Sequence, residues 1–87
     1  ILMGTRELNA QSDWFIYPNP ANDFIQIKGL LTNQEIQITI IDINGNVLLS
    51  KITNAAEPID LSLLSSGIYQ FVIEREQTKE TKKLIKL

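Results

Sequence analysis

The sequence predicts an all-β fold. Three stretches, 24–28, 36–42 and 69–74, alternate apolar and polar residues with the period of two that a half-buried strand requires. Residues that favour turns separate these stretches from one another. Counting all such segments gives about seven short strands, and that pattern is typical of an immunoglobulin-like antiparallel β-sandwich.

The composition is that of one small folded domain with no nucleic-acid partner. The chain has 87 residues, of which 44% are hydrophobic and 21% charged, so it can build a single core. Its net charge of −2 argues against nucleic-acid binding, which needs a basic face. No apolar run reaches membrane-spanning length, and the opening Ile1, Leu2 and Met3 are followed at once by polar residues, so no signal-peptide core is predicted.

Residues 1–13 are predicted to be a linker or a vector-derived segment, because 4–13 mixes small, polar and charged residues without periodicity. The chain does not begin with Met, so we expect a fragment of a larger protein. The folded domain is predicted to span 14–87. It begins with the aromatic pair Trp14 and Phe15, and Trp14 is expected to cover the core rather than to stack on a sugar.

A proline corner joins the first two predicted strands. Pro18 and Pro20 flank Asn19, so φ is fixed twice and two backbone donors are missing. The first strand should therefore end at Tyr17, and the second, 24–28, should end at Gly29.

The strand at 36–42 runs into Asn44 and Gly45, a hairpin signal that allows two loop lengths. A two-residue loop would place Ile38 opposite Lys51.

A three-residue loop, with Gly45 left-handed in a bulge, places Ile40 opposite Leu48 and Ile36 opposite Ile52. It keeps one face apolar, and we choose it. The predicted core is then Ile36, Ile38, Ile40, Leu48, Ile52, Tyr69, Phe71 and Ile73.

The last third of the chain adds a short strand at 59–61, the strand beginning near Tyr69, and a final strand at 81–87. The spacing of Leu64 and Tyr69 resembles a tyrosine corner, in which the hydroxyl bonds upstream backbone. In the final strand we expect the lysines outside, and Ile85 and Leu87 inside.

Catalysis, metal binding and cofactor binding are not expected. The chain has no His and no Cys, which removes the commonest general base, metal ligands and thiol nucleophile. Asp23, Asp42 and Asp60 lie beside predicted turns and are interpreted as turn residues. The segment 65–67 has two serines but no basic partner, so we predict that the protein is not an enzyme and takes no cofactor.

Four segments in order resemble the type IX secretion (Por secretion) C-terminal sorting domain, type A, of Bacteroidetes. They are the proline corner 17–20, the hairpin 40–47, the segments 59–62 and 64–69, and the basic end 83–86. The resemblance covers 15–87. Asn46 departs from it, because the family often carries Arg or Lys after the hairpin glycine.

The resemblance implies a secretion signal that acts by binding. The type IX translocon would recognise it for export across the outer membrane, and a sortase-like peptidase would then remove it from the upstream cargo domain. The implied path leads through the periplasm to the cell surface or the exterior. The residues that the resemblance implicates in recognition are Tyr17, Pro18, Asn19, Pro20, Asp42, Gly45, Gly67, Tyr69, Lys83 and Lys86.

Three alternatives stay open. The domain could instead be an immunoglobulin-like or fibronectin-like module for adhesion or carbohydrate binding, but a sorting signal must be C-terminal, and the chain stops after its last strand. Lys79, Lys82, Lys83 and Lys86 could protect an exposed edge strand, or a receptor could read them. Edge strands could also pair two copies into a homodimer.

Overall fold

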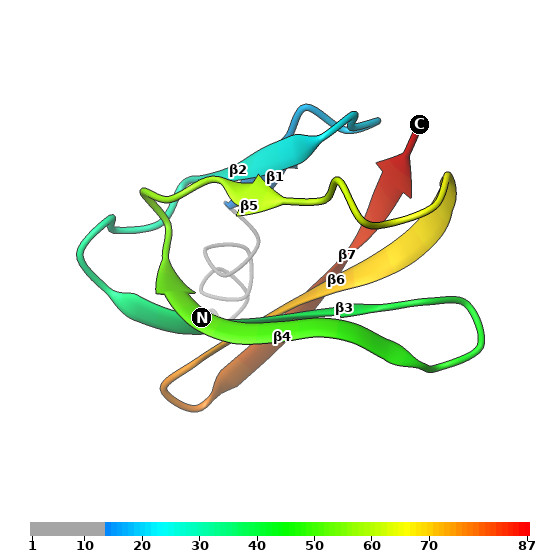
Figure 1. Cartoon of the computed structure of the whole chain (residues 1–87). Helices are drawn as coiled ribbons and strands as arrows, with labels where there is room; N and C mark the ends of the chain where they lie inside the picture. The colour runs from blue at the N-terminus through cyan, green and yellow to red at the C-terminus, as the bar shows by residue number, and fades with distance from the viewer. Residues whose placement is uncertain (1–13) are drawn as a thin grey trace, which may run out of the picture.

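The computed structural model describes residues 14–87, and the predicted segment 1–13 lies outside them. Two antiparallel sheets pack face to face in this part of the chain (Figure 1). The smaller has the order β1-β2-β5 and the larger β4-β3-β6-β7. The all-β sandwich prediction is confirmed. The strands are β1 (Phe15–Tyr17), β2 (Phe24–Lys28), β3 (Glu35–Ile41), β4 (Val47–Asn54), β5 (Ile59–Asp60), β6 (Gly67–Arg75) and β7 (Thr78–Lys86).

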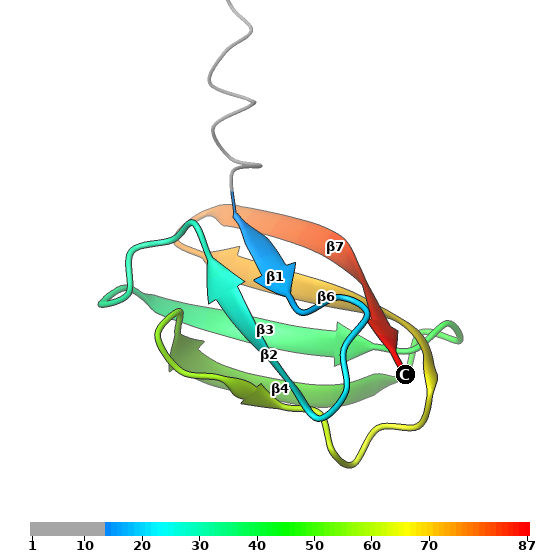
Figure 2. The same ribbon diagram turned by 90° about the horizontal axis from the view of Figure 1, so that it is seen from above.

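The core lies between the two sheets, where the period-two pattern places the apolar side chains. Viewed from above, the small sheet crosses the central strands of the larger one (Figure 2). Six of the eight predicted core residues are buried, namely Ile36, Ile38, Ile40, Tyr69, Phe71 and Ile73. The smaller sheet supplies Ile16, Ile25, Ile27 and Ile59. These strands form because alternate isoleucines bury one face of each sheet.

The hairpin between β3 and β4 corrects the predicted register. Its loop is the three-residue one, since the Asp42 amide donates to the Asn46 carbonyl at 2.9 Å and Gly45 has φ of 88°. Beyond Val47, which pairs with Ile41, the register shifts by one. The pairing of Ile40 with Leu48 and of Ile36 with Ile52 was therefore wrong. The observed pairs include Ile40 with Leu49, Ile38 with Lys51 and Ile36 with Thr53.

The exposure of β4 follows from this shift and from its position. A bulge adds one residue to β4 between the turn and the regular ladder. Each residue of β4 after the bulge therefore lies opposite a different residue of β3 than the turn alone would set. β4 is also the edge strand of the larger sheet. Leu48 and Ile52, which we expected to be buried, are 44% and 63% exposed.

The last strand also differs from its prediction. Leu84 is fully buried, whereas Ile85 is half-buried and Leu87 is 59% exposed. Lys82 and Lys86 share the face of Leu84 and are half-buried, so the expectation that all lysines point outward was wrong. The cause is the pairing with β6, because the buried Tyr69 lies opposite Leu84 and fixes the phase of β7.

Trp14 covers one end of the core, as predicted. Its side chain is 1% exposed, and its ring lies 6.2 Å from that of Phe71. The indole N–H donates to the Glu80 carboxylate, and the Lys82 ammonium lies 5.0 Å from the Trp14 ring. Glu80 and Lys82, the charged residues on the inner face of β7, therefore contact Trp14 at the margin of the core.

Candidate recognition site

The proline corner contacts the last strand through the side chain of Asn19. Both Tyr17–Pro18 and Asn19–Pro20 are cis peptides, and the two prolines are exposed. Asn19 Nδ2 donates to the Lys83 carbonyl at 2.8 Å, and the Ile85 amide donates to Asn19 Oδ1 at 2.9 Å. One side chain therefore satisfies two main-chain groups of β7, as a neighbouring strand would.

Ala21 continues this contact with its own backbone. Its amide donates to the Ile85 carbonyl at 2.7 Å, and the Leu87 amide donates to the Ala21 carbonyl at 2.8 Å. Ala21 is fully buried. We call these four hydrogen bonds, made by Asn19 and Ala21 to residues 83–87, the corner clasp. Because β7 pairs with β6 on its other side, the end of the chain is bonded along both edges.

Asp42 closes the β3–β4 turn. Its Oδ1 accepts hydrogen bonds from the amides of Asn44 and Asn46, each at 2.9 Å. The amide of Asn46 is the main reason that the pKa of the Asp42 carboxyl lies below its usual value. Asn46 Nδ2 also lies 3.2 Å from Asp42 Oδ2, so the residue that departs from the resemblance still bonds this carboxylate.

Tyr69 forms the predicted tyrosine corner. Its hydroxyl donates to the Ser65 carbonyl at 2.6 Å, while its ring is buried. Gly67 begins β6 two residues earlier, and it pairs with Lys86 of the last strand. The Tyr69 hydroxyl thereby ties the segment before β6 to β6 itself, whose first residue pairs with the end of β7.

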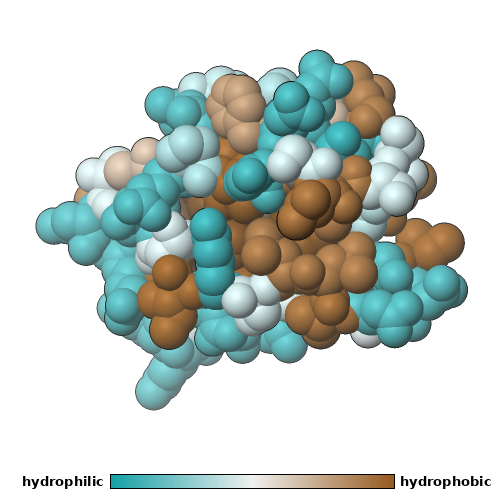
Figure 3. Space-filling view, in the orientation of Figure 1, coloured by the Kyte–Doolittle hydropathy of each residue, from teal (hydrophilic) through white to brown (hydrophobic). Residues whose placement is uncertain are grey.

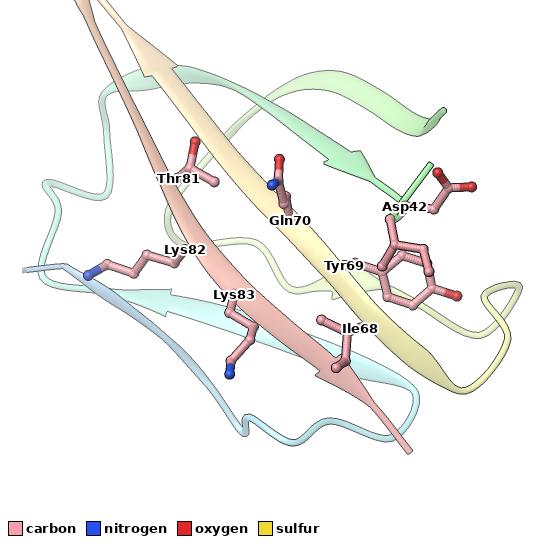
Figure 4. Close-up of a pocket in the computed structure, with 8 residues that line it drawn as sticks. Asp42, Ile68, Tyr69, Gln70, Thr81, Lys82 and Lys83 are labelled. Carbon is pink, nitrogen blue, oxygen red and sulfur yellow. The ribbon is translucent and has the colours of Figure 1, made fainter. Parts of the chain in front are cut away.

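Three of the four sequence segments meet at a shallow hollow on this end of the larger sheet. The hollow has a volume of about 390 Å³, and its lining includes Asp42, Tyr69 and Lys83 (Figure 4). Ile68 and Gln70 of β6 also line it. The clasp joins the fourth segment, the proline corner, to the same strand.

Seven of the ten predicted site residues do not line this hollow, among them Tyr17 and Lys86. Tyr17 lies on the smaller sheet, where its hydroxyl donates to Gln26 Oε1 at 2.9 Å and the Lys28 ammonium is 5.6 Å from its ring. Lys86 is half-buried, and its ammonium donates to the Leu87 carbonyl at 3.2 Å. Lys83, by contrast, is exposed.

The carboxylates of Asp42 and Asp60 serve turns of the backbone. Within residues 14–87 no group of three or more His, Cys, Asp or Glu side chains is placed to hold a metal ion. Asp60, like Asp42, serves its own turn, accepting from the Ser62 amide at 2.8 Å. That hydrogen bond is the main cause of the lowered pKa of the Asp60 carboxyl. The same part of the chain has no helix long and apolar enough to cross a membrane.

Sequence reasoning placed Asn19 in the site but missed its partners on β7. It also missed Ala21, whose only local signal is a small residue directly after a proline corner.

Comparison with known proteins identifies the family of the folded part. The model of the secretion system C-terminal sorting domain family matches residues 15–87. No curated protein matches the chain. The chain belongs to the family of type IX secretion C-terminal sorting domains.

Proposed function

We propose that residues 14–87 are the unit of recognition, and that the type IX translocon reads the end of the sandwich held by the corner clasp. Membership of the family makes the chain a sorting signal, attached to an upstream cargo domain and used for export to the cell surface or the exterior. The family is one of non-catalytic tail domains. Transit through the periplasm and removal by a sortase-like peptidase complete the proposal.

The corner clasp is the observation that carries this proposal. The side chain of Asn19 makes hydrogen bonds to the backbone of Lys83 and Ile85, which lie 64 and 66 positions further along the chain. The clasp therefore holds the backbone at Lys83 only when both ends of the domain are folded together. A receptor that binds the surface around Lys83 would select cargo whose tail has completed folding.

The exposed chemistry at the site suits a partner rich in hydrogen-bond acceptors. Lys83 presents an ammonium beside the apolar Ile68 and the amide of Gln70, all lining one hollow. Lys86 is less available, because it is half-buried. We therefore assign the charged contact to Lys83, and we assign Lys86 to packing.

The test is a reporter fused in front of residues 14–87 and expressed in a Bacteroidetes host. Lys83→Gln should reduce the fraction of reporter at the surface without lowering the melting temperature by more than a few degrees, because the side chain is exposed. Lys79→Gln is the matched control, since Lys79 is also exposed on β7 but lies outside the hollow. Equal export of both variants and the parent would show that Lys83 only protects an edge.

A further inference from the structure

The larger sheet has two edges of different character. β7 carries four lysines, and its last residues are bonded by the corner clasp. β4 pairs with β3 alone among the described residues, which leaves the other edge of an eight-residue strand without a partner strand. Its one charged residue is Lys51. Natural edge strands usually carry several charges or a cover, so β4 lacks the protection that β7 has.

Apolar side chains gather beside this unprotected edge. Leu48 and Leu49 of β4 line a hollow with Leu63 and Leu64, and we call these four residues the leucine patch. Leu63 is 98% exposed. Figure 3 shows apolar surface on this side of the molecule, where β4 and β5 face the viewer. Exposed apolar clusters of this kind mark interaction surfaces.

We propose that a second copy of this chain docks on β4, antiparallel and about a two-fold axis perpendicular to the larger sheet. An edge strand is self-complementary, because its free N–H and C=O groups can pair with those of an identical antiparallel strand. The two four-stranded sheets would then join as one sheet of eight strands. Two-fold dimers are also the commonest symmetric assembly.

Charge supports a second copy as the occupant. Lys51 and Asp60 both line the hollow of the leucine patch, so the surface carries one charge of each sign and has no net charge to repel its own copy. The two-fold axis brings the leucine patches of both copies to the same side of the joined sheet. An axis through Ser50 sets Lys51 opposite the partner's Leu49 and keeps the two lysines apart.

The same argument disfavours pairing through β7. There an antiparallel copy would bring several lysines close to one another, and the corner clasp already occupies the edge at 83–87. The β4 contact rests on one strand and a small patch, so it buries less than the roughly 800 Å² per partner of a standard interface. The dimer should therefore be weak, with Kd on the order of 100 μM.

Sedimentation equilibrium of the whole chain tests the dimer. Between about 10 μM and about 1 mM, the average mass should rise from 9.9 kDa toward twice that value. Leu63→Asp should weaken association at least about tenfold, because it places a charge in the apolar contact. Leu31→Asp is the matched control, since Leu31 is 71% exposed but does not line the leucine patch. A monomer at 1 mM, or equal loss in both variants, would overturn the proposal.

A cysteine pair tests the strand register independently. The chain has no cysteine, so Ser50→Cys introduces a single thiol. Directly opposed residues in an antiparallel pair have Cα atoms about 4.5 to 5.5 Å apart, which a disulfide can bridge. Ser50→Cys should therefore form a covalent dimer under mild oxidation, whereas Lys79→Cys, exposed on the opposite edge strand, should not. Equal cross-linking of both variants would contradict the β4 contact. The proposal would also be contradicted if the protein stays monomeric and its β4 edge binds a strand of another protein.

Discussion

Replacing Asn19 by Ala removes half of the corner clasp without touching the core. The variant loses the hydrogen bonds to the Lys83 carbonyl and from the Ile85 amide. Each such bond contributes about 0.5 to 1.5 kcal/mol net. Asn19 is exposed, so water can replace part of the loss, and we expect a total cost of about 1 kcal/mol rather than the sum of both upper values. For a domain of this size, that lowers Tm by about 4 to 8 °C.

Thermal unfolding followed by fluorescence of Trp14, the single tryptophan, measures this loss. Asn22→Ala is the control, because Asn22 is an exposed asparagine three residues after Asn19. Amide exchange locates the effect, since the Ile85 amide should exchange faster in Asn19→Ala while the Ile38 amide changes only with global stability. If Asn19→Ala matches the parent in Tm and in Ile85 exchange, the clasp does not stabilise β7 in solution.

Three further changes test the fold. Ile38→Ala should cost about 2 to 4 kcal/mol in urea unfolding, because Ile38 is fully buried, and a cost below about 0.5 kcal/mol would refute its core position. Gly45→Val should cost more than about 1 kcal/mol, since φ of 88° is strained for a β-branched residue, and an unchanged midpoint would contradict the turn. The pKa of Asp42 is lower in the folded protein, so its ionised carboxylate stabilises the fold above the unfolded pKa of 3.8. This stabilisation is lost as the pH falls through the folded pKa. Asp42→Asn should flatten this acid dependence, and an unaltered profile would rule out Asp42 as its source.

Local pattern was sufficient to predict most of the strands. The alternation of isoleucines in β3 and of aromatic and aliphatic residues in β6 leaves one face to bury, and both strands lie at the centre of the larger sheet. The turn at Gly45 was predicted for a similar reason, because a left-handed glycine after Asn is a local signal. Interior strands with one apolar face have a single register that buries that face.

The edge strands could not be predicted in the same way. In 82–87 each phase mixes apolar residues with lysine, with Leu84 on one and Ile85 and Leu87 on the other. Only the pairing with β6 chooses between them. The bulge in β4 is also invisible locally, since nothing in Leu48 distinguishes it from its neighbours.

The corner clasp was missed for a different reason. A side-chain amide that bonds backbone 64 and 66 residues away leaves no periodic signal. The sequence suggested that Asn19 and Lys83 belong to one site through the resemblance to the sorting family, and the structure supplies their physical connection.

Export of two variants of matched stability tests most directly whether the translocon reads the clasped end. Asn19→Ala removes two of the four hydrogen bonds of the clasp. Ile38→Val costs a similar amount, about 0.5 to 1.5 kcal/mol, by removing one methylene from a core residue that makes none of the clasp's bonds. With a reporter fused in front of residues 14–87, surface delivery should fall in Asn19→Ala and remain near the parental level in Ile38→Val. Equal delivery of the two variants would contradict the account, because export would then depend on stability alone.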